Sequence, residues 1–135
     1  FLAARSENIK YLKKFYKKKI ILLDRFTDST IAYQHYGMGI NLTILKKINN
    51  YLVKNFKVDF TFLNIVSKNN MKRRLYQRKT LNRYDKFKNN FYKKVQNGFL
   101  KIAKRKKSTY QIINSNLSIK LNKKIIINKI DKLIK

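Results

Sequence analysis

The chain has 135 residues, of which 44% are apolar and 13% aromatic, so it can bury a core and is not a disordered tail. It holds no cysteine and one histidine, which excludes disulfides, thiolate metal sites and a histidine-based metal cluster. It contains no run of about 18 apolar residues, so we expect a cytoplasmic protein with no membrane partner.

The formal net charge of +28 has two interpretations. Clustered lysine and arginine gain affinity for polyanions by releasing counterions, which favours a basic nucleic-acid-binding module. However, lysine far outnumbers arginine, and Lys, Asn and Ile, which share A/T-rich codons, are all abundant. We favour compositional drift of solvated faces, and nucleic acid stays the alternative partner.

The first segments read as a helix followed by a strand. Apolar residues at helical spacing predict a helix over Leu2–Lys19. The continuous apolar run Ile20–Leu23 then predicts a buried parallel strand. It ends abruptly at Asp24 and Arg25, as a strand does at the functional edge of an α/β sheet.

The next elements repeat this alternation. A helix is predicted over Ser29–Tyr36 that stops at Gly37, followed by a helix over Leu42–Lys54 with Asn41 as its N-cap. Aromatic and branched residues over Val58–Ile65 predict a second strand.

The C-terminal half is predicted to hold three helices and a strand. The helices cover Asn69–Gln77, Asp85–Lys104 and Ile119–Ile134, and the strand covers Tyr110–Ile113. Strands that alternate with helices indicate an α/β fold with a parallel sheet and helices on both faces. Because there is no proline and no repeat, we expect a single domain.

The window Asp24–Gly39, with the sequence DRFTDSTIAYQHYGMG, is the candidate for chemistry, because it keeps two of the six acidic residues. An aspartate at the end of a buried strand is placed to hold Mg²⁺ or its waters, and the planar guanidinium of Arg25 suits a phosphate. The structural alternative is that Asp24 caps the next turn and pairs with Arg25 on the surface.

The segment DRFTDSTIAYQ resembles the signature of thymidylate kinases. Phe1 and Arg5, one helical turn apart, resemble the family's thymine-binding pair. The stretch 72–85, KRRLYQRKTLNRYD, looks like the family's mobile lid, and 91–100, FYKKVQNGFL, looks like the helix after it. The resemblance implies a P-loop NTPase-like nucleoside monophosphate kinase that transfers a phosphoryl group from ATP to dTMP with Mg²⁺.

The resemblance also implies a role for each matching residue. Phe1 stacks on thymine, Arg5 and Gln34 hydrogen-bond its edge, and Arg25 grips the dTMP phosphate. Asp24 orients Mg²⁺, through water or directly, or the acceptor phosphate. The implied residues lining the nucleoside pocket are Ser29, Thr30 and Tyr33.

The lid supplies positive charge in this interpretation. Arg78, with Arg74 and Arg83 as further lid arginines, neutralises charge on the transferring phosphoryl group. The implied division is a dTMP-binding region over residues 1–66, a lid over 69–85 and C-terminal helices with the last strand over 86–135. A homodimer is implied for the full-length protein.

Packing alternatives stand beside these roles. Phe1 could belong to the core, Tyr33 and Tyr36 could only pack, and His35 is expected to be a partly exposed helix residue without a catalytic role. The lid arginines Arg73, Arg74, Arg78 and Arg83 would otherwise be a solvated basic face.

The sequence departs from the family at two positions and lacks one motif. Asn82 and Asn114 stand where the family has aspartate. No GxxxxGK[ST] motif occurs, and the chain opens on Phe1 rather than methionine. We therefore expect an N-terminally truncated kinase domain without its first strands, with the acceptor site present, the ATP-phosphate loop absent and no turnover by itself. A protein that has lost catalysis is a third alternative.

Overall fold

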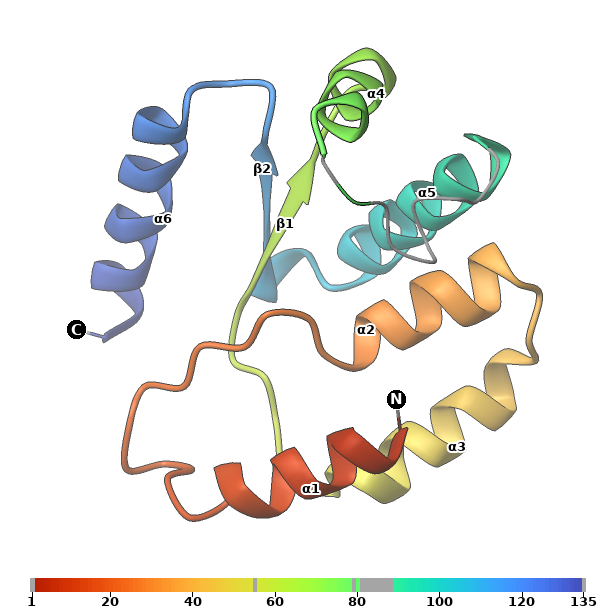
Figure 1. Cartoon of the computed structure of the whole chain (residues 1–135). Coiled ribbons are helices and arrows are strands. Elements are labelled where there is room, and N and C mark those ends of the chain that lie inside the picture. The colour runs from red at the N-terminus through yellow and green to blue at the C-terminus, as the bar shows by residue number, and fades with distance from the viewer. Residues whose placement is uncertain (1, 55, 79, 81–88, 135) are drawn as a thin grey trace. The chain divides into compact units, whose positions relative to one another are not determined.

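The computed structural model describes residues 2–54, 56–78, 80 and 89–134, and Figure 1 shows their elements along the chain. They form two compact units: unit 1 comprises Phe1–Asp59 and Asn90–Ile102, and unit 2 comprises Phe60–Asn89 and Ala103–Lys135. Within the described ranges, no helix is long and apolar enough to cross a membrane. The predicted division into a dTMP-binding region, a lid and a C-terminal region stays a prediction.

Unit 1 is helical in its regular elements. They are α1 (Leu2–Leu12), α2 (Thr27–Thr30), the π-helix η1 (Ile31–Gly37), α3 (Leu42–Val53) and most of α5 (Asn89–Arg105). Helix α3 contacts both α1 and η1. The buried apolar residues of this unit are Ile9, Ala32, Leu45, Phe56, Val95 and Ile102.

Helix α3 forms as the sequence predicts. The Asn41 side chain accepts hydrogen bonds from the backbone N–H of Thr43 at 2.8 Å and of Ile44 at 3.2 Å, so it caps the helix. The predicted helix over Ser29–Tyr36 also exists and ends at Gly37, but most of it is wound as a π-helix. Such turns are rare and occur frequently at functional sites.

Helix α1 is shorter than predicted, because it ends at Leu12 rather than Lys19. Lysines at positions 10, 13, 14, 17 and 18 stand three or four residues apart, and like charges at this spacing destabilise a helix. The chain instead forms turns up to Lys18, with Lys17 in the left-handed region at φ 63°.

The predicted strand over Ile20–Leu23 is wrong. These residues have no strand structure, and Ile20 and Leu22 are 65% and 80% exposed. A strand needs a neighbour for its backbone N–H and C=O groups, and the sheet formed by the described residues pairs only β1 with β2.

Unit 2 holds the parallel sheet, with β1 (Thr61–Ile65) and β2 (Tyr110–Asn114) in the register Leu63 opposite Ile112. Its helices are α4 (Lys68–Tyr76), the 3₁₀ turn η3 (Lys107–Thr109) and α6 (Ile119–Ile134). Both strands and their parallel pairing confirm the sequence prediction, although β1 begins three residues later than expected. The bounds predicted for α6 are those observed, whereas the predicted start of α5 at Asp85 lies outside the described residues.

Candidate functional site

Arg5 is the buried cation of unit 1. Its side chain, on α1, is only 7% exposed. Nη1 donates to Asn49 Oδ1 at 3.0 Å and Nη2 donates to the Phe26 carbonyl oxygen at 3.3 Å, while the guanidinium carbon lies 5.7 Å from the centre of the Phe26 ring. Burial lowers the pKa of Arg5, but an arginine starts so far above neutrality that it stays protonated.

These contacts join two segments that the sequence assigned to one site. Phe26 belongs to the DRFTDST motif, 21 positions from Arg5, and its carbonyl accepts from Arg5 and also from the Ser29 backbone N–H at 3.1 Å. The start of α1 and the start of α2 are therefore in direct contact, as a shared binding site requires.

Asn49 is a residue that the sequence analysis missed. It is 4% exposed on the buried face of α3, one helical turn after the buried Leu45. The signal was available, because Leu42, Leu45, Asn49 and Leu52 follow the heptad-like spacing of a buried stripe, in which Asn49 is the polar member.

The doublet Asp24-Arg25 is exposed to solvent. The Arg25 guanidinium carbon lies 5.1 Å from the centre of the Tyr33 ring, a cation–π distance, and the Arg25 backbone is left-handed at φ 66°. A residue with a Cβ is strained in this region, and such outliers cluster at functional sites. Phe26, not Asp24, is the N-cap of α2, and no side chain caps that helix.

The helical part of the motif buries polar groups. Ser29 and Thr30 are buried on α2, and Thr30 Oγ1 and Gln34 Oε1 have no hydrogen-bond partner within the described parts of the chain. Buried polar atoms are normally hydrogen-bonded. A ligand with donor groups would satisfy both atoms.

Tyr33 packs and also supports the motif. Its ring meets those of Phe91 and Phe99 edge-on at 6.0 and 6.2 Å, while Arg25 lies against it. Tyr33 therefore packs within unit 1 and also contacts Arg25, and its place in the nucleoside pocket stays a prediction.

His35 and Tyr36 hold the end of η1. His35 Nδ1 lies 2.8 Å from the Ile40 carbonyl oxygen, which places the proton on Nδ1. Tyr36 packs against Gly98 of α5, where an added Cβ would lie 2.5 Å from Tyr36 Cδ2. These contacts agree with a structural role for both residues.

Acidic groups are sparse here. Across the residues that the structure describes, no three Asp, Glu or His side chains form a group that could hold a metal ion. Mg²⁺ is commonly bound through one or two carboxylates together with water and substrate phosphates. A single exposed carboxylate at Asp24 fits that mode, and the predicted contact stays a prediction.

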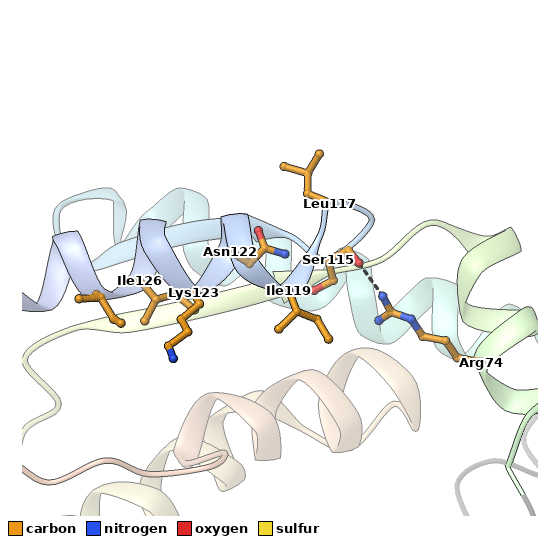
Figure 2. Close-up of a pocket in the computed structure, with 8 residues that line it drawn as sticks. Arg74, Ser115, Leu117, Ile119, Asn122, Lys123 and Ile126 are labelled. Carbon is orange, nitrogen blue, oxygen red and sulfur yellow. Dashed lines mark hydrogen bonds between the residues drawn. The ribbon is translucent and has the colours of Figure 1, made fainter.

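Arg74 and Arg78, the described members of the predicted lid arginines, belong to unit 2. Arg74 donates from Nη2 to the Ser115 carbonyl oxygen at 2.6 Å, so it reaches from α4 to the loop after β2 (Figure 2). Arg78 follows α4 and is exposed. Phe1, Asn82 and Arg83 lie outside the described residues.

Arg74 also borders a pocket of about 470 Å³ in unit 2 (Figure 2). Its other lining residues come from the loop after β2 and from α6: Ser115, Leu117, Ile119, Asn122, Lys123, Ile126 and Ile127. Asn122 Oδ1 is buried there without a partner in the described chain, while its Nδ2 donates to the Asn114 carbonyl oxygen at 3.0 Å. A guanidinium beside an apolar wall suits a flat heteroaromatic ring.

Comparison with known proteins gives a consistent result. The family model "Thymidylate kinase" matches residues 1–126. The chain is 35% identical to a thymidylate kinase from Sulfurihydrogenibium sp. (strain YO3AOP1), over 82% of this chain and 53% of that protein. It is 38% identical to one from Wolbachia pipientis wMel, over 76% of this chain and 51% of that protein. The chain thus spans about half the length of these curated relatives.

A solved structure shows the same likeness. The crystal structure of thymidylate kinase from Ehrlichia chaffeensis matches with a TM-score of 0.71 and 28% identity, over 96% of this chain and 63% of that chain. This confirms the predicted fold class, a nucleoside monophosphate kinase fold of which the described sheet is a portion.

Proposed function

The chain belongs to the thymidylate kinase family, and on that premise we propose that it supplies the dTMP-binding side of an enzyme that phosphorylates dTMP. In this reaction, an oxygen of the dTMP phosphate attacks the γ-phosphorus of ATP, and ADP leaves as dTDP forms. The observation that carries the proposal is the hydrogen bond between Arg5 and the Phe26 carbonyl, which links the two segments expected to bind the nucleotide.

Base recognition falls to the buried polar groups of unit 1. Arg5 donates to a carbonyl of thymine, and Phe1 stacks on the ring. Gln34 Oε1 and Thr30 Oγ1 are acceptors without a partner in the described chain, and the N–H of thymine is a donor that suits such an atom. Satisfying a buried polar atom favours the matching base over one that leaves it unpaired.

Phosphate binding falls to Arg25, whose exposed guanidinium is held against Tyr33 at 5.1 Å. Stacking fixes the plane of the guanidinium fork, so less conformational entropy is lost when it binds a phosphate. The left-handed backbone at φ 66° is the cost of this placement and supports a functional role. Ser29 completes the acceptor site.

Charge on the transferring group is neutralised by cations. We assign this role to Arg78 and to the further lid residues Arg74 and Arg83, with Asp24 holding Mg²⁺ through water. When bound, Mg²⁺ stabilises negative charge on the phosphates. ATP as donor, the lack of turnover by the chain alone and a homodimer belong to the same proposal.

Binding of dTMP and of thymidine by the 135-residue chain, measured by calorimetry, tests the acceptor site. Arg25→Ala is expected to weaken dTMP binding roughly 10- to 150-fold, the equivalent of one hydrogen bond to a charged group. Thymidine lacks the phosphate, so its affinity is expected to stay unchanged.

Two further variants separate this effect from charge and folding. Lys46→Ala removes an equal charge from the exposed face of α3 and should leave both affinities unchanged. Arg25→Gly relieves the strain of the left-handed backbone, so this variant should unfold at a higher temperature than Arg25→Ala. It should nevertheless bind dTMP as weakly as Arg25→Ala. If Lys46→Ala weakens dTMP binding as much as Arg25→Ala does, net charge alone explains the effect. Salt-sensitive binding of single-stranded DNA without any dTMP binding would favour the nucleic-acid alternative.

A further inference from the structure

Asn49 occupies a position that an apolar residue would fill more stably. It lies 4% exposed in the buried stripe of α3, where the residue one turn earlier is Leu45. Its Oδ1 accepts from Arg5 Nη1 at 3.0 Å, which fixes the orientation of the amide. Its Nδ2 is then buried with no hydrogen-bond partner in the parts of the chain that are described. An unsatisfied amide in a core destabilises the fold, so its presence needs a reason.

The contacts of Arg5 supply that reason. A guanidinium is planar, so two fixed nitrogens define the orientation of the whole group. Asn49 Oδ1 holds Nη1 from α3, and the Phe26 carbonyl holds Nη2 from the start of α2. The Phe26 ring lies 5.7 Å from the guanidinium carbon and limits its movement out of this plane.

We infer that Asn49 is a positioning residue, which fixes the guanidinium of Arg5 in the orientation that reads the carbonyl edge of a pyrimidine base. This inference rests on the proposed function. Asn49 contributes to base recognition through Arg5 and makes no contact with the ligand itself. Without this amide oxygen, Arg5 keeps its charge and its burial but loses the hydrogen bond that holds Nη1, so the orientation of the guanidinium is less firmly fixed.

A double-mutant cycle on the 135-residue chain tests this mechanism, with dTMP affinity as the readout. Asn49→Leu, which has no acceptor, is expected to weaken binding about tenfold, within the range for coupled neighbours. Asn49→Asp keeps an acceptor oxygen on Arg5 and should retain affinity to within about threefold. In an Arg5→Met background, Asn49→Leu should cause no further loss. Asn50→Ala, at the exposed neighbouring position of α3, is the matched control and should bind like the wild type.

Stability separates positioning from a merely structural role. The pair Arg5→Met with Asn49→Leu replaces both polar partners by apolar groups, so this variant should unfold at the same temperature as the wild type or higher. It should nevertheless bind dTMP more weakly than the wild type. If this variant instead unfolds at a much lower temperature, Asn49 serves the fold and the inference is overturned.

A measurement without ligand keeps this test distinct from the test of the proposed function. In nitrogen-15 NMR spectra, a guanidinium held at two nitrogens gives separate, slowly exchanging Nη–H signals, which Asn49→Leu should merge. If the wild type does not bind dTMP, the proposed function fails, and these signals still decide whether Asn49 holds Arg5. If the wild type binds, and Asn49→Leu changes neither the signals nor the affinity, the inference fails alone.

Discussion

Gly98→Ala is the substitution whose effect the structure specifies most closely. Gly98 is buried in the middle of α5, and a Cβ built there would lie 2.5, 2.6 and 2.7 Å from Cδ2, Cγ and Cβ of Tyr36. Real Cβ atoms do not approach other atoms so closely, so η1 or α5 must shift. Because Tyr36 Cβ is fixed to the backbone, rotating the ring cannot relieve the clash.

Two terms of opposite sign determine the magnitude. Replacing glycine by alanine inside a helix favours folding by about 1 kcal/mol, whereas overpacking a filled contact costs roughly 1–3 kcal/mol. The net expectation is a loss of about 1 kcal/mol in the free energy of unfolding, or about 4 °C in melting temperature. Because η1 also carries Tyr33 and Gln34, dTMP binding should weaken as well.

Urea denaturation followed by circular dichroism measures the change. Asn97→Ala, at the exposed neighbouring position of α5, is the control and should stabilise the chain by about 0.5 kcal/mol through helix propensity alone. If Gly98→Ala stabilises the chain by a full 1 kcal/mol, Gly98 is an ordinary helix position and the close packing of α5 on η1 is refuted.

Two further predictions concern single elements and use the same denaturation assay. Ile113 is 1% exposed on β2, so Ile113→Ala should lower the free energy of unfolding by about 2–5 kcal/mol. The neighbouring Ile112 is 53% exposed, so Ile112→Ala should lower it by about 1 kcal/mol or less. Equal losses would contradict the assignment of Ile113 to the buried face of β2 and Ile112 to the exposed face. Asn41→Ala removes the cap that accepts hydrogen bonds from the backbone N–H of Thr43 and Ile44, and it should lower the free energy of unfolding by about 1 kcal/mol. Asn50→Ala, inside the same helix, should cause no loss. If the stability of the Asn41 variant is unchanged, the cap does not stabilise α3.

Local rules were sufficient for the elements whose stability is local. Asn41, the apolar stripe of α3, the branched residues of β2 and the periodicity of α6 each specify structure within a few residues, and those elements appear where the sequence predicts them. The motif DRFTDSTIAYQ, together with the segments at 1–5, 72–85 and 91–100, predicted the family, and the family comparison confirms it.

Non-local partners decided the elements that the sequence analysis missed. Ile20–Leu23 has the composition of a buried strand, but a strand exists only beside another strand, and composition does not supply one. The early end of α1 at Leu12 has a local cause instead, because the lysines around its end repel one another at helical spacing.

The same division between local sequence and non-local contacts applies to the candidate site. The sequence alone determined which residue types stand in the motif, and the family resemblance predicts from them that Arg25 binds the phosphate and Arg5 the base. Only the tertiary structure decided that Arg5 is buried between α3 and the carbonyl of Phe26, that Asn49 holds it, and that Arg25 rests on Tyr33. Those contacts join residues 8 to 44 positions apart, and hydrogen bonds and ring contacts over such separations are set by how helices pack, which no local pattern records.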